Sequence, residues 1–183
     1  RDCDDSNETL TALMDAVMKD EDIPSECFIR HQAEGIDIIC SNIGLAGTEV
    51  QLVNAMSREY VLKQILYGIK DQYDAVIIDC MPSLGMLTIN ALTAANSVLI
   101  PIQCEFYALE GLSQLIHSVN LIKERLNPEL EMEGVVFTMY DSRTNLSSQV
   151  VENVKSNLDE NICETIIPRT IRLAEAPSHG MPI

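Results

Sequence analysis

Short runs of β-branched and aliphatic residues alternate along the chain with longer stretches of helical periodicity, and this alternation constrains the fold more than any other feature. Two of the runs, AVIID at 75–79 and SVLIPI at 97–102, are apolar almost without interruption. Such runs are typical of parallel strands that are covered on both faces. The strands predicted in this way cover 36–40, 75–79, 97–102, 135–140 and 164–167, and the helices cover 9–19, 48–70, 84–95, 109–126 and 146–158.

Strands and helices in this order predict an α/β protein with a three-layer, mostly parallel sheet and helices on both faces. The composition agrees, because 46% hydrophobic and 22% charged residues are typical of a globular chain. Aromatic residues make up only 4% and Trp is absent, so aliphatic side chains must form most of the core. A length of 183 residues fits one ordinary domain, and we expect residues 1–183 to form a single domain.

The sequence also bounds the compartment and the partners. No apolar run approaches the roughly 18 residues that a membrane-spanning helix needs, and no signal peptide opens the chain, so we expect a cytoplasmic location and no membrane partner. The six cysteines are scattered without a C-x-x-C pair, which favours small buried hydrophobes over metal ligands. The net charge of −16 repels a phosphate backbone, and no run of basic residues offsets it.

Asp79 is the clearest candidate for chemistry, because it closes the apolar run AVIID. Ligands of open parallel sheets bind beyond the carboxyl ends of the strands. An apolar strand that ends in Asp has the general form of a Walker B element, whose carboxylate orders Mg²⁺ and its waters near phosphates. Taken alone the pattern is weak, since a strand-end Asp more often caps a turn or the next helix.

Four segments in order along the chain carry a more specific signal. They are GIDIICSNIGLAGTEVQL at 35–52, IIDCMPSLGMLTINALTAANSVLIPIQCEFYALEGLSQL at 77–115, EGVVFTMYDSRTNL at 133–146 and IIPRTIRLAEAPSHGMPI at 166–183. In these segments the chain closely resembles the ParA/Soj partitioning ATPases, which are P-loop proteins with a deviant Walker A motif. The resemblance runs along nearly the whole chain.

This resemblance implies an ATPase that dimerises around ATP and Mg²⁺, acts in chromosome or plasmid segregation, and is stimulated by a ParB/Spo0J-type centromere-binding partner. By position, Asp4 would be the Walker A′ carboxylate and Asp79 the Walker B carboxylate, both catalytic and both holding Mg²⁺ through water. Pro82 would belong to the adjoining switch at 82–85. The adenine pocket would form from Met139, Tyr140, Asp141, Pro168 and Arg169.

Relatives also bind nonspecific DNA through basic residues late in the chain. Arg143, Arg169 and Arg172 are the candidates here. The helix at 146–158 leads into Asp159 and Glu160, where relatives often carry basic residues, so the resemblance implies nucleoid association that is weakened by an acidic surface.

The P-loop of the family is not found within the 183 residues. No Lys follows a Gly anywhere in the sequence, so the chain contains no Gly-Lys-Ser/Thr to neutralise phosphates. We expect the P-loop strand and helix to lie before residue 1 and a further helix after residue 183. This chain is therefore expected to be a partial ATPase domain that binds ATP weakly or not at all. The alternatives are a natural paralogue without a P-loop that docks a partner and hydrolyses nothing, and a MinD-like positioning ATPase.

Overall fold

The computed structural model describes residues 8–21, 28–32, 35–81, 83–158 and 161–179. Its internal contacts divide the chain into two compact units. The first consists of residues 1–95 and 122–128, and the second of residues 96–121 and 129–183. The single domain expected over 1–183 stays a prediction.

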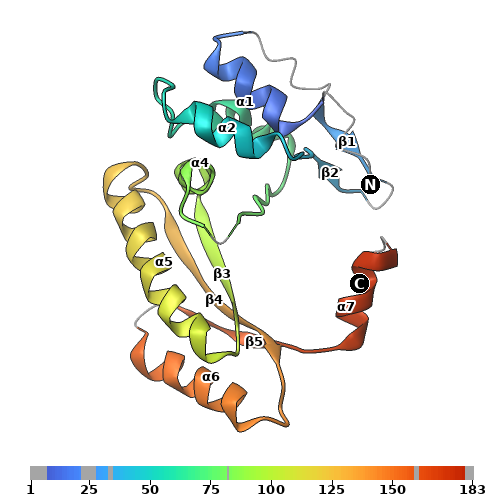
Figure 1. Cartoon of the computed structure of the whole chain (residues 1–183), viewed down its shortest axis with the longest axis vertical. Coiled ribbons are helices and arrows are strands. Elements are labelled where there is room, and N and C mark those ends of the chain that lie inside the picture. The colour runs from blue at the N-terminus through green and yellow to red at the C-terminus, as the bar shows by residue number, and fades with distance from the viewer. Residues whose placement is uncertain (1–7, 22–27, 33–34, 82, 159–160, 180–183) are drawn as a thin grey trace. The chain divides into compact units, whose positions relative to one another are not determined.

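The second unit contains a three-stranded parallel sheet in the order β3-β4-β5. β3 covers Ser97–Gln103, β4 covers Glu131–Tyr140 and β5 covers Ile162–Pro168. Helix α5 (Phe106–Arg125) connects β3 to β4, and α6 (Asn145–Asn157) connects β4 to β5, as Figure 1 shows. The predicted α/β class with parallel strands and crossover helices is confirmed, and so are the strands expected at 97–102, 135–140 and 164–167.

The core of this unit joins the sheet to both crossover helices. Phe137 and Val135 of β4 are fully buried, and they cluster with Leu112 of α5 and with Val151 and Val154 of α6. A bulge in β4 sets Val98 opposite Met132 but Leu99 opposite Gly134. Gly134 has φ +154°, and a Cβ atom there would lie 3.1 Å from the Asn161 carbonyl oxygen, so the bulge requires a residue without a side chain.

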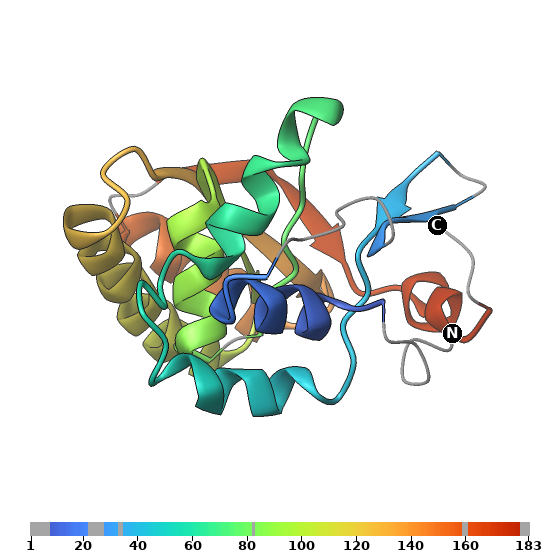
Figure 2. The same ribbon diagram turned by 90° about the horizontal axis from the view of Figure 1, so that it is seen from above.

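The first unit is mainly helical. The buried side chain of Asn90 on α4 joins this helix to α3 and to the turn before it. Its carboxamide oxygen accepts the Leu62 N–H, and its NH₂ group donates to the carbonyls of Arg58 and Met86. Seen from above in Figure 2, α1 (dark blue) lies beside α2 (cyan). The helices are α1 (Leu10–Met18), α2 (Leu45–Leu52), α3 (Val61–Tyr67) and α4 (Met86–Ala94), with the short 3-10 helix η2 (Lys70–Gln72).

Two predictions in this unit are wrong, and a third is wrong in part. The single helix expected over 48–70 is two helices separated by turns at 53–60, where Ser57 adopts the left-handed φ of +50°. The strand expected at 36–40 is reduced to β2 (Asp37–Ile38). It pairs antiparallel with β1 (Arg30–His31), which the sequence did not predict.

The second of the two wrong predictions is the strand expected at 75–79. These residues form no strand. Ile77 is 93% exposed and Val76 44% exposed, whereas Ile78 is partly buried against the core of the first unit. A strand exists only by pairing with a neighbour, and in the described part of this unit the sheet is the hairpin β1–β2 alone. The run therefore has strand composition without a strand partner.

One further helix was not predicted. Helix α7 (Ile171–His179) follows β5. Within the described ranges, no helix is both long enough and apolar enough to cross a membrane.

Candidate functional site

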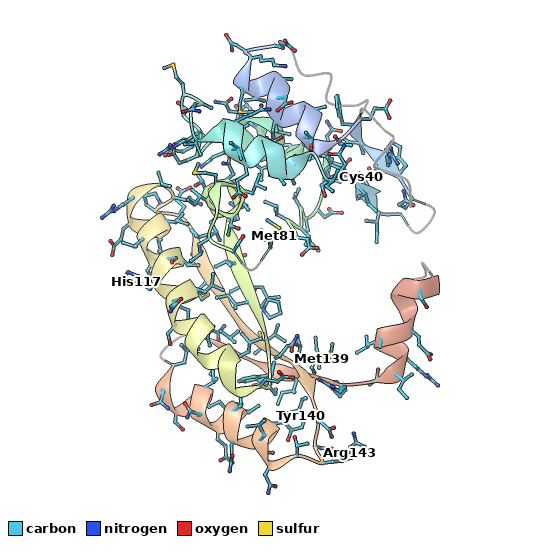
Figure 3. The ribbon with its side chains drawn as sticks, in the orientation of Figure 1. Cys40, Met81, His117, Met139, Tyr140 and Arg143 are labelled. Carbon is cyan, nitrogen blue, oxygen red and sulfur yellow. The ribbon has the colours of Figure 1, made fainter. Side chains whose placement is uncertain are left out.

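The carboxyl ends of the parallel strands in the second unit bring together residues that are far apart in sequence. The register pairs Tyr140, the last residue of β4, with Pro168, the last residue of β5. Beyond this pair, the Arg169 N–H donates to the Tyr140 carbonyl at 2.9 Å. Figure 3 shows Met139, Tyr140 and Arg143 at one end of the β4 ribbon. The structure thus places residues 139–141 and 168–169 side by side at the sheet edge where such folds bind ligands.

Asp141 is held in a fixed orientation by Arg143. Oδ1 accepts from Arg143 Nε at 2.9 Å and from the Arg143 backbone N–H at 3.0 Å, and Oδ2 accepts from Nη2 at 2.7 Å. These bonds, led by the side-chain contact with Arg143, lower the pKa of Asp141 from 3.8 to about 2. The charge of Arg169 contributes in the same direction. Asp141 is therefore a carboxylate near neutral pH and cannot donate a hydrogen bond.

The start of α6 fixes the same turn from the other side. Thr144 caps the helix, since its hydroxyl oxygen accepts from the Ser147 N–H at 3.4 Å and its O–H donates to the Asp141 carbonyl at 3.0 Å. The Tyr140 hydroxyl lies 3.1 Å from the Ser148 hydroxyl. This capping arrangement joins the strand end to the helix, so the two elements hold the site as one piece.

Met139 has an unusual backbone for its place. Its φ is +54°, in the left-handed region, which costs a residue with a side chain on the order of 1–2 kcal/mol. Its side chain is 43% exposed. Backbone strain beside a strand end is often found at binding sites, and here it presents a flexible apolar side chain at the sheet edge.

Sequence reasoning missed one member of this edge. Glu105, just after β3, lies with one carboxylate oxygen 3.6 Å from Nη2 of Arg169. Both side chains are more than half exposed, so this ion pair adds little to the stability of the fold and mainly orients the Arg169 side chain. The sequence signal that could have identified Glu105 is a carboxylate shortly after the predicted parallel strand at 97–102.

Of the two predicted catalytic residues, the structure describes Asp79 alone. Asp79 belongs to the first unit, where it is exposed on the extended segment at 75–80. The pKa of the neighbouring Cys80 thiol is raised, first by desolvation of the sulfur and second by the Asp79 carboxylate. Asp4 and Pro82 lie outside the described residues. In the parts of the chain that the structure describes, no three His, Cys, Asp or Glu side chains form a metal-binding group. The Mg²⁺ roles of Asp4 and Asp79 therefore stay predictions.

Comparison with known proteins assigns a family to this arrangement. A family model described as an AAA domain matches residues 2–132. The sporulation initiation inhibitor protein Soj of Bacillus subtilis is 57% identical over 150 residues, which cover 82% of this chain and 59% of that protein. The chromosome partitioning protein ParA of Myxococcus xanthus is 53% identical over 148 residues, covering 81% of this chain and 52% of that protein. The chain thus spans between half and three fifths of the length of these relatives.

Solved structures agree with the fold. A cobyrinic acid a,c-diamide synthase from Mycobacterium smegmatis, solved with a bound ATP analogue and magnesium, superposes with a TM-score of 0.81 at 32% identity. The match covers 94% of this chain and 74% of that one. The parallel sheet with its crossover helices and the AAA-domain match define an α/β protein of the nucleoside-triphosphatase type. Within that class, the chain belongs to the ParA/Soj family of chromosome-partitioning ATPases.

The residues described at this sheet edge fit the base end of a nucleotide. An exposed Met139 side chain and the oriented Asp141 carboxylate provide an apolar surface and a hydrogen-bond acceptor, which is the chemistry that a purine with an exocyclic amino group requires. A triphosphate requires backbone N–H groups freed by glycines and a neighbouring Lys. The 183 residues contain no Gly-Lys-Ser/Thr segment.

Proposed function

We propose that the chain is the central part of a partitioning ATPase whose ATP-dependent dimer acts in chromosome or plasmid segregation. The observation that carries the proposal is the 57% identity over 150 residues with Soj of B. subtilis. The identity to the diamide synthase is lower, at 32%, which favours partitioning over the reaction that its name describes. A ParB/Spo0J-type protein is the proposed partner that stimulates hydrolysis.

Each site residue has a proposed role in the complete enzyme. Met139, Tyr140, Asp141, Pro168 and Arg169 form the base side of the nucleotide site, and their convergence at one sheet edge supports this role. Asp79 and Asp4 would hold Mg²⁺ through water, and Asp4 would also orient the attacking water. Bound ATP supplies the phosphoryl group that is transferred to this water.

The electrostatics of the site limit the proposed contact with nonspecific DNA. Both oxygens of Asp141 engage Arg143, so this arginine presents little net charge to a phosphate. Arg169 lies near Glu105. Arg172 is exposed on α7 and is the remaining candidate of the three. Together with the net charge of −16, this favours weak and strongly salt-dependent DNA binding.

We further propose that this chain alone is inactive because it lacks a phosphate-binding loop. The test is a fusion in which the P-loop segment of B. subtilis Soj precedes residue 1. ATP binding and hydrolysis are measured for the chain alone, for the fusion, and for the fusion carrying Asp79→Asn. We expect no hydrolysis by the chain alone, hydrolysis by the fusion, and loss of about 100-fold or more in the Asp79→Asn fusion, in line with the loss of a metal-ordering group.

The controls separate this reading from the alternatives. Asp74→Asn in the fusion is the matched control, because Asp74 is an exposed carboxylate shortly before the same segment. A folded fusion that binds no ATP favours a paralogue without catalysis. Tight ATP binding by the chain alone, lost on Asp79→Ala, contradicts the proposal, since the phosphates would then be held by other groups. A ParB-type protein that leaves the hydrolysis rate of an active fusion unchanged contradicts the proposed partner.

A further inference from the structure

The solvent side of α3 forms a concave surface in the first unit. The opposite side of this helix packs into the core through Val61, Leu62 and Ile65, which are at most 6% exposed. The outward side borders an open hollow of about 420 Å³. The residues that line it, called the α3 hollow below, are Ser57, Tyr60, Lys63, Gln64 and Tyr67.

Two tyrosines give the α3 hollow its apolar surface. Tyr67 is 77% exposed, in a chain with only three Phe, five Tyr and no Trp. The ammonium of Lys70 lies 5.8 Å from the centre of its ring. Tyr60 lies two helical turns earlier on the same side of α3, and its hydroxyl donates to the Leu126 carbonyl at 3.3 Å. Exposed tyrosines with a cation beside them are enriched where proteins bind other proteins.

The charged side chains located at the α3 hollow are basic, although the protein as a whole is acidic: Lys63 lines the hollow and Lys70 lies over the Tyr67 ring. The chain carries a net charge of −16, yet residues 58–72 and 122–126 together hold five of its 12 basic residues and only three acidic ones. The bond from Tyr60 to Leu126 brings the end of α5 to the start of α3. The ion pair of Glu59 with Arg58 at 2.9 Å cancels one charge of each sign, which leaves four basic residues against Asp71 and Glu124. The five basic residues are Arg58, Lys63, Lys70, Lys123 and Arg125.

We infer that the α3 hollow is a docking surface for a short acidic segment of a protein partner. One apolar or aromatic side chain of the segment lies between Tyr60 and Tyr67, and its carboxylates meet Lys63 and Lys70. The volume of the hollow is enough for one or two side chains. A long polyanion such as DNA is repelled by the excess negative charge of the chain, whereas a short peptide meets mainly the local positive charge. The surface belongs to the first unit and does not depend on the proposed nucleotide chemistry.

Fluorescence anisotropy with labelled peptides tests this inference on the purified chain. The probes carry alternating Asp and Glu around one Phe, Leu, Tyr or Pro, and matched probes replace every Asp and Glu by Asn and Gln. We expect at least one acidic probe to bind at least about tenfold more tightly than its amide counterpart. Lys63→Glu combined with Lys70→Glu should weaken that probe by about tenfold or more, and Tyr67→Ala should weaken it too.

Lys155→Glu is the matched control, because Lys155 is an exposed lysine on α6 in the second unit. Lys155→Glu should change the affinity for the acidic probe by no more than about twofold, because an exposed charge outside the contact surface contributes little to binding. Circular dichroism checks that each variant is folded. The inference is overturned if acidic and amide probes bind alike, or if the double lysine variant and Lys155→Glu bind alike. It is also overturned if a single-stranded DNA oligonucleotide binds more tightly than any peptide and shows the same sensitivity to Lys63 and Lys70.

Discussion

The guanidinium of Arg143 contacts both carboxylate oxygens of Asp141, two residues earlier, at 2.9 Å and 2.7 Å. Such a two-pronged contact fixes the plane of the carboxylate as well as its charge. Asp141 lies at the sheet edge beside Pro168 and Arg169, so Arg143 orients the polar side chain of the candidate base site. The arginine acts on this site through Asp141.

Removing Arg143 should raise the pKa of Asp141 from about 2 toward 3.8. In the wild type the lowered pKa stabilises the fold fully above pH 3.8, and this contribution is lost as the pH falls through about 2. The stability difference between wild type and Arg143→Ala should therefore be present at neutral pH and shrink below pH 3.8. Carbon-detected NMR titration of the Asp141 carboxyl measures the pKa directly. Arg172→Ala is the control, and an unchanged Asp141 pKa in Arg143→Ala would contradict the geometry.

Asn90→Ala should destabilise the first unit by about 2–4 kcal/mol. The Asn90 carboxamide is fully buried and makes three hydrogen bonds to backbone groups of Leu62, Arg58 and Met86. Its removal leaves the buried Leu62 N–H, in the first turn of α3, without its partner and takes one hydrogen bond from each of the two carbonyls. Urea unfolding followed by circular dichroism gives the change. Asn120→Ala, at an exposed position of α5, should shift the stability by less than about 0.5 kcal/mol.

Phe137→Ala should cost about 3–5 kcal/mol, because it opens a cavity in the core of the second unit. Phe137 is fully buried on the central strand β4. Leu146→Ala is the matched control, since Leu146 is 47% exposed on α6 and should cost less than about 1 kcal/mol. Equal losses in the two variants would show that β4 is not the centre of this core.

Asp79→Asn should increase the reactivity of Cys80 toward iodoacetamide at mildly alkaline pH. The Asp79 carboxylate is the second cause of the raised pKa of this thiol, and the thiolate is the reactive form. Part of the increase in pKa should remain, because desolvation is the larger cause. Mass spectrometry of the alkylated Cys80 peptide measures the rate, with Asp74→Asn as the control. A slower reaction in Asp79→Asn would contradict the assigned direction.

Local pattern predicted most elements of the second unit but not the breaks in the first. The runs at 97–102, 135–140 and 164–167 form β3, β4 and β5, because each pairs with another predicted strand. The run at 75–79 has the same composition and remains unpaired. The break of the helix expected over 48–70 depends on turns around Ser57, and these have no strong Gly or Pro signal.

The α/β class, the ParA/Soj resemblance and the residue types at the strand ends follow from the amino-acid order, because periodicity and motif spacing are properties of the chain. The contact of Tyr140 with Pro168 and the hold of Arg143 on Asp141 are visible only in the folded structure. The folded structure also showed that Tyr60, Lys63 and Tyr67 line one open hollow. These relationships depend on register and on side-chain direction, and both are decided when distant segments pack together.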